Sequence, residues 1–333
     1  MKKLLYIYFF CSLYLSCTRN SETEKYQNKR DNIIDVREKV KEIETGDVLI
    51  GSIATVNLFR DYLIILDFKS LDKLIRIFDK NSFNYITSVG RKGQGPGEII
   101  NMGHLAVNEA DGKFYVTDHS KLNIFSFDID SVLADTAYMP SIKLKLNKNI
   151  FPDRYLYIND TLCIGRRIEI IDKDFKQSVA KWNIQTGEIT PMKYTHPNIK
   201  NKRSLVTASE KHGKYVEVYE LYDLITICNL EGDLEYNIYG PSWDKRRVRT
   251  KHYYGPVRFC NDKIVAAYSG GNYRTDEYYP TKLIIFDLNG DYLKTLDVEY
   301  KINDFCFDKE NSRIIMSLND VIQFAYLDLD GLI

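Results

Sequence analysis

LIIFDLNGDYLKTLDV, residues 283–298, consists of two apolar segments joined by the polar turn Asn289-Gly290. Asn-Gly between apolar segments is a strong signal for a β-hairpin, because both residues tolerate the positive φ angles of a tight turn. Related units with an apolar segment, a polar turn and a second apolar segment occur at residues 74–90, 122–135, 179–192, 224–240 and 321–333. The chain is therefore predicted to repeat one antiparallel hairpin unit along its length.

Two further short strands are expected ahead of most of these hairpins. In the unit with residues 283–298 they are VRFCN and KIVAAYS, and in the unit with residues 74–90 they are SIATVNL and YLIILD. Six units of four strands, starting at intervals of roughly 40–60 residues, are typical of a β-propeller. The 25 tyrosines and 16 phenylalanines also favour strands. We expect an all-β fold, a six-bladed β-propeller with four-stranded antiparallel blades over residues 32–333.

The end of the chain leaves the sixth blade incomplete. Its last hairpin unit reaches Ile333, so one outer strand is missing from that blade. The segment NIIDVRE, residues 32–38, precedes the first blade and could supply this strand. We therefore expect the ring to be closed by an N-terminal strand, which removes the free edges of the first and last blades.

The first residues have the pattern of an export signal. Lys2 and Lys3 precede the apolar stretch Leu4–Leu15, which is too short to span a bilayer and suits a signal peptide. Small Ser16 and then Cys17 follow, as in bacterial lipoprotein signals, in which the cysteine becomes the lipidated first residue. Ordinary secretory cleavage nearby is the alternative.

These features divide the N-terminal region into two segments. We expect residues 1–16 to be a lipoprotein-type signal peptide and residues 17–31, which are polar and charged, to be a flexible tether. A lipid on Cys17 would anchor the chain in the bacterial cell envelope, with the outer membrane as the expected location. The propeller would then lie in the periplasm or at the cell surface.

Charge and cysteine content exclude several classes of protein. The chain has 46 basic and 46 acidic side chains, so no global field draws it to nucleic acid. Four cysteines beyond the signal region lie in strand-like contexts at spacings that match no disulfide framework or zinc motif. They are Cys163, Cys228, Cys260 and Cys306. We expect free, buried thiols.

The glycine-rich segment GRKGQGPGE, residues 90–98, is not a nucleotide-binding loop. Pro96 and Gly97 stand where a phosphate-binding loop has its lysine and hydroxyl residue, and the sequence that follows is strand-like instead of helical. The segment lies between the outer strand of one predicted blade and the inner strand of the next. We therefore expect a corner here that returns the chain from rim to axis, shaped by Gly93, Gly95, Pro96 and Gly97.

VGRKGQGPGEI after a hairpin, behind a lipoprotein-like signal, resembles the TolB-like six-bladed propeller lipoproteins of Bacteroides-type bacteria. More distantly, the blades are similar to those of NHL-repeat proteins. The resemblance extends over about residues 32–333, and the glycine-rich loop is its most specific part. It implies an exported, membrane-tethered propeller, and it carries no catalytic residues that could be transferred to this chain.

Loops on one face of a propeller surround the channel mouth, and that face is the usual binding surface. Basic and aromatic residues of the predicted loops would form a rim there for a small anionic or sugar-like ligand, or for an acidic patch on an envelope protein. The candidates for this ligand-binding rim are Arg91, Gln94, Glu98, Arg166, Arg167, Trp243, Arg246, Arg247, Tyr273 and Arg274. The alternative is that the charges are solvated loop surface and that the tyrosines pack between blades.

The function expected from these features is that of a non-catalytic binding or scaffold module, monomeric and without a cofactor. The alternative is a metal-dependent hydrolase or lyase of the six-bladed lactonase type, with a calcium ion in the channel. Such an enzyme needs ligands from the inner strands of at least three blades. The scattered candidates for these ligands are His104, Asn303, Asp304 and Glu98. No serine-hydrolase motif is present.

Overall fold

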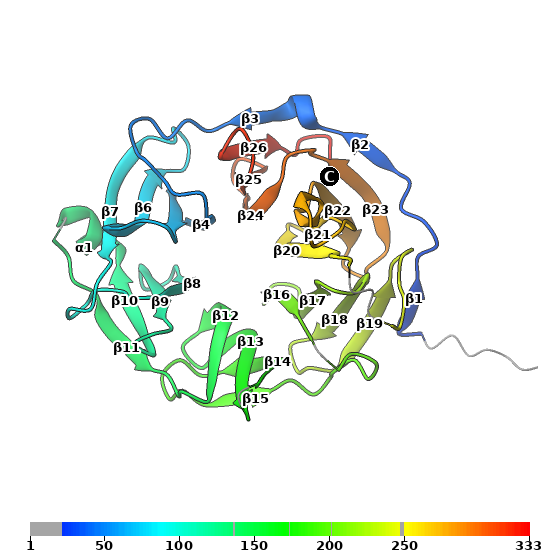
Figure 1. Ribbon diagram of the computed structural model, residues 1–333, viewed down its shortest axis with the longest axis horizontal. Helices are drawn as coiled ribbons and strands as arrows, with labels where there is room; N and C mark the ends of the chain where they lie inside the picture. The colour runs from blue at the N-terminus through cyan, green and yellow to red at the C-terminus, as the bar shows by residue number, and fades with distance from the viewer. Residues whose placement is uncertain (1–21, 136, 173, 201, 247–249) are drawn as a thin grey trace, which may run out of the picture.

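The structure is a computed structural model that describes residues 22–135, 137–172, 174–200, 202–246 and 250–333. These residues form six sheets arranged radially around a central axis (Figure 1). Each sheet has four antiparallel strands running from the axis to the periphery, and two sheets carry a fifth strand at the outer edge. The predicted all-β, six-bladed propeller is confirmed.

The first three blades follow one another directly in the sequence. Blade one contains β4 (Ala54–Phe59), β5 (Tyr62–Asp67), β6 (Lys73–Asp79) and β7 (Tyr85–Arg91). Blade two contains β8 (Met102–Asn108), β9 (Lys113–Asp118), β10 (Asn123–Asp128) and β11 (Ser141–Lys145). Blade three contains β12 (Ile150–Asn159), β13 (Leu162–Ile171), β14 (Asp174–Trp182) and β15 (Ile189–Pro191).

The last three blades receive strands from the N-terminus as well. Blade four contains β16 (Ser204–Ser209), β17 (Lys214–Tyr219), β18 (Leu224–Asn229) and β19 (Leu234–Tyr239). Blade five contains β20 (Tyr254–Cys260), β21 (Lys263–Tyr268), β22 (Lys282–Asp287) and β23 (Tyr292–Asp297). Blade six contains β24 (Ile302–Asp308), β25 (Arg313–Leu318) and β26 (Phe324–Asp328).

One predicted hairpin is wrong. In the unit at residues 122–135, the second segment forms helix α1 (Ile129–Ala134), and the outer strand of blade two is β11 further along the chain. Asp128 caps this helix by accepting a hydrogen bond from the backbone N–H of Ser131. Two short 3₁₀ helices, η1 (Arg37–Lys39) and η2 (Asp276–Tyr278), complete the described secondary structure. None of the helices in the described residues is long and apolar enough to span a membrane.

The core is divided among the interfaces between neighbouring blades. Middle strands such as β5 are buried on both faces, which explains why Leu63–Leu66 is continuously apolar instead of alternating. The four cysteines predicted to be free and buried are confirmed as such: Cys163, Cys228, Cys260 and Cys306.

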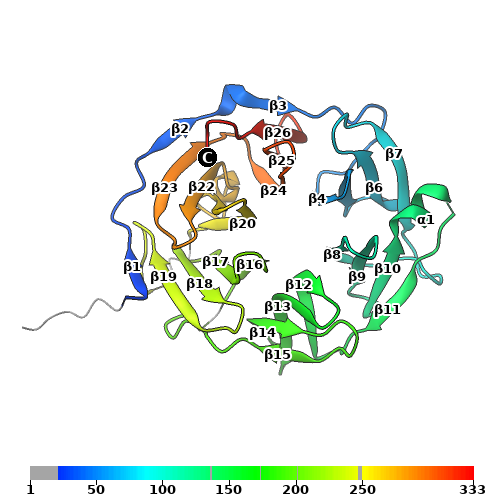
Figure 2. The ribbon, with the colours of Figure 1, turned by 180° about the vertical axis from the view of Figure 1, so that it is seen from behind.

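Before blade one, residues 22–43 form an N-terminal arm along the outer edge of blades four, five and six (Figure 2). β1 (Glu24–Tyr26) pairs in parallel with β19, and β2 (Ile33–Asp35) pairs in parallel with β23. β3 (Val40–Glu42) pairs antiparallel with β26 and becomes the fourth strand of blade six. Closure of the ring by an N-terminal strand is therefore confirmed.

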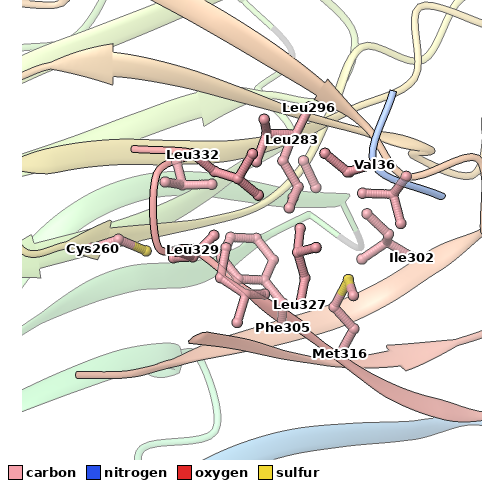
Figure 3. Close-up of a cluster of buried hydrophobic side chains, with 14 of the residues drawn as sticks. Val36, Cys260, Leu283, Leu296, Ile302, Phe305, Met316, Leu327, Leu329 and Leu332 are labelled. Carbon is pink, nitrogen blue, oxygen red and sulfur yellow. The ribbon is translucent and has the colours of Figure 1, made fainter. Parts of the chain in front are cut away.

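The segment predicted to close the ring, residues 32–38, lies one blade too early. Its strand pairs with blade five, and Val36 enters the apolar cluster between blades five and six (Figure 3). The closing strand Val40–Glu42 has largely exposed, charged side chains, which suit an outer edge. It therefore lacks the apolar pattern on which the prediction relied.

The tether predicted over residues 17–31 overlaps this arm. Residues 22–31 are described, and β1 among them is held on blade four. Asn237 Nδ2 donates to Glu24 Oε1 at 2.9 Å, and the ring of Tyr26 stacks on that of Tyr239 at 4.5 Å between centroids. The folded part of the chain thus begins before residue 32, and the predicted signal peptide and Cys17 lie outside the described residues.

Candidate functional site

The inner strands β4, β8, β12, β16, β20 and β24 surround the axis of the ring (Figure 1). We call the face at the N-terminal ends of these strands the top face, because the crossings from each outer strand to the next inner strand lie there. Side chains from the inner strands of several blades meet in an axial channel that begins at this face.

Four inner strands carry a β-bulge near the top face. In β8, β12, β20 and β24 the pairing with the next strand shifts by one residue, after Met102, Pro152, Tyr254 and Ile302 respectively. A bulge re-aims the side chains of the extra residues. In blade three these residues are Asp153 and Arg154, so the bulge presents two opposite charges near the axis.

The bulge in β12 depends on a glycine in the neighbouring strand. Gly165 of β13 pairs with Tyr155, just past the bulge. A Cβ atom at Gly165 would overlap the carbonyl oxygen of Arg154 and the Cα of Tyr155. Only glycine therefore lets the two backbones approach this closely.

The channel contains two adjoining cavities. The upper cavity, nearer the top face, has a volume of about 220 Å³, and the lower cavity has a volume of about 230 Å³. We call the residues that line both cavities the waist: Asn57, His104, Arg154 and Arg258. Because the waist residues come from blades one, two, three and five, the ring as a whole positions them.

Asp153 is the centre of a charged cluster in the upper cavity. The Nε of Arg166 donates to its carboxylate at 2.7 Å, and His119 Nε2 lies 3.5 Å from the other carboxylate oxygen. Burial opposes the charged form, but the hydrogen bond to His119 and the guanidinium of Arg166 hold the pKa of Asp153 well below its usual range. Arg166 also donates to the carbonyl oxygen of Ser204 at 2.9 Å.

A second ion pair lies across the channel. Arg258 donates to Asp304 at 2.9 Å and to the carbonyl oxygen of Val257 at 2.9 Å. The carboxylate of Asp304 is almost completely buried. Both carboxylates that line the upper cavity are thus held by guanidinium groups.

His104 is held as a neutral ring at the waist. Enclosure by the ring of blades, together with the charges of Arg154 and Arg258, lowers its pKa to about 3. Its Nε2 lies 2.8 Å from the carbonyl oxygen of Tyr155, which makes this nitrogen the donor. The histidine therefore adds no charge to the channel at neutral pH.

The predicted loop at residues 90–98 is a self-contained corner. Glu98 turns back on its own loop, and its carboxylate accepts a hydrogen bond from the backbone N–H of Gly95 at 2.8 Å. Lys121 Nζ donates to the carbonyl oxygens of Gly95 and Glu98, at 2.7 Å each. Gly97 has a φ of 69°, as a glycine corner requires. The polar groups of this loop are thus satisfied within the loop and by Lys121.

Arg91 and Gln94 of the same loop are exposed, away from the channel. Arg91 lies 4.0 Å from Asp72. In blade three, Arg166 faces the channel, whereas its neighbour Arg167 interacts with Glu169 at 3.0 Å and Ser178 at 3.4 Å. Adjacent residues of a strand point to opposite faces of the sheet, which separates the two arginines.

The remaining rim candidates lie on or near the loops around blades four and five. Trp243 packs against Tyr239, with ring centroids 4.7 Å apart, and it contributes to the core. Arg246 is exposed beside Asp244, and Arg247 lies outside the described residues. Tyr273 lines a separate cavity of about 370 Å³, and the guanidinium of Arg274 lies 5.9 Å from its ring centroid.

The structure thus separates the predicted rim into unconnected sites and places Arg166 alone among the described rim candidates in the channel lining. Two of the metal-ligand candidates, His104 and Asp304, also line the channel, but each already has a protein partner. Glu98 is held in its loop. In the described part of the chain, no three His, Cys, Asp or Glu side chains are grouped closely enough to hold a metal ion.

Sequence reasoning missed most of the channel. Five residues that line the upper cavity were not among the candidates: Asn57, His119, Asp153, Arg154 and Arg258. The available signal was Pro152-Asp153-Arg154 inside an otherwise strand-like segment, because proline in a strand often marks a bulge.

The fold agrees with comparisons to known proteins. The sequence matches a family described as 6-bladed beta-propeller, DUF5128, over residues 20–225. No match was found among curated proteins. The crystal structure of a DUF4221 family member from Bacteroides vulgatus has a TM-score of 0.61 at 12% identity, covering 86% of this chain and 94% of that one. A Bacteroides fragilis protein described as exported has a TM-score of 0.56 at 13% identity, covering 89% and 87%.

At such low identity the structural similarities establish the fold alone. The family match is of a different kind, because it rests on the sequence itself and extends over more than half of the chain. The protein belongs to the DUF5128 family of six-bladed β-propellers.

Proposed function

We propose that the protein is a non-catalytic binding module of the cell envelope that takes a small ligand into its axial channel from the top face. The observation that carries this proposal is the pair of adjoining cavities, which share a waist built from four blades. A site assembled from several blades is rigid, and rigid positioning of a few polar groups is what a small-molecule site requires.

The charges in the channel favour binding over metal-dependent catalysis. Asp153 and Asp304 are the carboxylates of the upper cavity, and each accepts hydrogen bonds from an arginine. A calcium ion would have to displace these guanidinium groups and would still face the positive charge of Arg154. Neutral His104 has its Nε2 engaged by a backbone carbonyl. These pairings support a binding role over the lactonase-type alternative.

Export and anchoring are supported by the N-terminal sequence. A signal peptide over residues 1–16 and a lipid on Cys17 would make the protein an envelope lipoprotein, like the TolB-like propellers that it resembles. The similar Bacteroides fragilis protein is described as exported. The proposed lipoprotein is a monomer. The chain between Cys17 and β1 would then join the lipid to blade four. An envelope protein or a small anionic or sugar-like molecule would be the partner.

Blocking the channel tests the binding role. Leu156 lines the lower cavity, so Leu156→Trp should fill it, whereas Leu71→Trp changes a leucine that is 90% exposed in a surface turn. The full-length proteins would be titrated by calorimetry with small acids, sugars and neutral amphiphiles. We expect a compound that binds the wild type and Leu71→Trp but not Leu156→Trp. Ligands that bind all three equally would show that the channel is not the site.

Two further measurements test the remaining parts of the proposal. Cys17→Ser should move the protein from the membrane fraction to the soluble fraction, and retention in the membrane would contradict the lipid anchor. A lactone and ester screen with added calcium should show no turnover. Turnover that a chelator abolishes would replace the binding module with an enzyme.

A further inference from the structure

The two halves of the channel differ in chemistry. The upper cavity is bordered by the charged side chains of Asp153, Arg166 and Asp304, with His119 beside them. The lower cavity is bordered largely by apolar residues of blades two, three and four: Leu105, Ala106, Val107, Leu156, Leu205 and Val206. The waist, with Arg154 and Arg258, lies at the boundary between these two environments.

Arg154 has an uncompensated positive charge at this boundary. Its side chain is exposed inside the channel, and the blades surround that channel. Arg166 and Arg258 each have an aspartate partner, but no carboxylate among the described residues lies within 4.0 Å of Arg154. The upper cavity and waist together have three guanidinium groups and two carboxylates.

The surroundings of Arg154 destabilise its charge. Enclosure by protein and the guanidinium of Arg166 lower the pKa of Arg154, and this effect outweighs the attraction of Asp304 and Asp153. Folding therefore places a cation beside other cations without supplying a counter-charge for it. An anion bound beside it would supply the missing counter-charge.

The backbone holds Arg154 in this position. Arg154 belongs to the two-residue bulge in β12, and Gly165 leaves the space that the bulged backbone needs. The bulge thus directs Asp153 toward His119 and Arg166, and it leaves Arg154 at the waist. Because the bulge fixes the backbone of Arg154, its side chain starts from a defined position at the waist, which lowers part of the entropic cost of binding a carboxylate.

We propose that the channel binds a small organic anion with an apolar body, its charged head group on Arg154 at the waist and its apolar part in the lower cavity. This assignment rests on the proposed function and names the class of ligand for the same site. A cavity of about 150 Å³ lined by aliphatic side chains is sufficient to bind benzene. The lower cavity, about 230 Å³, is large enough for a ring or a short alkyl chain.

A homologous series of ligands separates the contributions of the head group and the apolar body. Acetate, butyrate and hexanoate would be titrated into the full-length protein by calorimetry, with hexanol and inorganic phosphate as the comparison ligands. We expect the dissociation constant to fall about threefold to fourfold per added methylene, the effect of burying a CH₂ group. Hexanol, which lacks the charge, should bind at least about tenfold more weakly than hexanoate.

Variants test the role of Arg154. Arg154→Gln should weaken hexanoate binding at least about tenfold and leave hexanol binding unchanged, and Arg154→Lys should lie between Arg154→Gln and the wild type. Arg37→Gln removes a positive charge from the exposed arm, where Arg37 contacts Glu299, and should leave both ligands unaffected. The hexanol titration also reports whether each variant retains a folded channel.

The outcomes distinguish this inference from the broader proposal. Equal affinity for hexanoate and hexanol, or unchanged hexanoate binding by Arg154→Gln, would overturn the anion assignment. Phosphate that binds more tightly than hexanoate would overturn the apolar-body assignment. If the carboxylates do not bind but another compound is lost in Leu156→Trp, the channel remains a binding site and only the ligand class proposed for it is wrong.

Discussion

The N-terminal arm and the axial channel each place an arginine inside the molecule, in opposite electrostatic situations. Arg30 of the arm lies between blades four and five, with its guanidinium 3.0 Å from Asp223 and with side-chain exposures of 6% and 0% for the pair. The same carboxylate accepts hydrogen bonds from Tyr254 at 2.9 Å and from the backbone of Ser242 at 3.0 Å. Arg154 in the channel faces solvent and has two arginines as neighbours.

This difference in pairing gives the two arginines different roles: the charge of Arg30 is structural, and the charge of Arg154 is available to a ligand. At Arg30, the fold supplies the counter-charge and excludes water, so the arginine joins the arm to the ring. At Arg154, the fold supplies the position but leaves the charge uncompensated. Removing the first should therefore damage the fold, and removing the second should damage binding.

The largest expected effect on stability is at the arm. Arg30→Met removes one partner of a buried ion pair and leaves Asp223 unpaired, which should lower the free energy of unfolding by about 3–5 kcal/mol in urea titrations. The control Arg37→Met breaks an exposed pair with Glu299 and should change stability little. Equal effects of the two substitutions would show that the Arg30 pair does not hold the arm.

A smaller loss is expected at the bulge that positions Arg154. Gly165→Ala forces a Cβ atom onto the backbone of Arg154 and Tyr155, and should lower the free energy of unfolding by about 1–3 kcal/mol. At Gly95 the added Cβ would lie 2.9 Å from the Glu98 carboxylate, a side chain that can move. Gly95→Ala should therefore destabilise less, and the opposite order in urea titrations would contradict a rigid bulge.

The channel ion pair should also give a pH dependence. The pKa of Asp153 is lowered in the folded protein, so its carboxylate contributes stability above the unfolded pKa of about 3.9, and this contribution is lost as the pH falls below that value. The stability difference between wild type and Asp153→Asn should be constant from about pH 7 to 5 and should shrink below about pH 4. A difference that persists unchanged at low pH would mean that the carboxylate charge does not stabilise the channel.

The fold could be predicted because its signal is repeated. Polar turns between apolar segments, such as Asn289-Gly290, recur in most blades, and an error in one unit does not change the period. Helix α1 and the closing strand Val40–Glu42 were missed because they depend on a local cap and on an exposed edge, which leave little apolar pattern. Their positions are set by the neighbouring blades.

The site could be predicted only in part. The most conspicuous motif, residues 90–98, has its polar groups satisfied within the loop and by Lys121. Arg154 lies in a segment with no recognisable motif, and its charge becomes significant only through the residues that the ring brings near it. Which residues meet at the axis depends on the register of several blades, and a bulge shifts that register by one residue.

The smallest expected effect on stability, and the most direct test of the account, is at Arg154. We predict that Arg154→Gln leaves the free energy of unfolding unchanged or raises it by less than about 0.5 kcal/mol, because the lost charge has no carboxylate partner and its surroundings disfavour it. In the same thermal melts, hexanoate should raise the Tm of the wild type, and at the same concentration it should raise the Tm of Arg154→Gln much less. A variant that is strongly destabilised, yet still stabilised by hexanoate as the wild type is, would show that Arg154 serves the fold and does not bind the ligand.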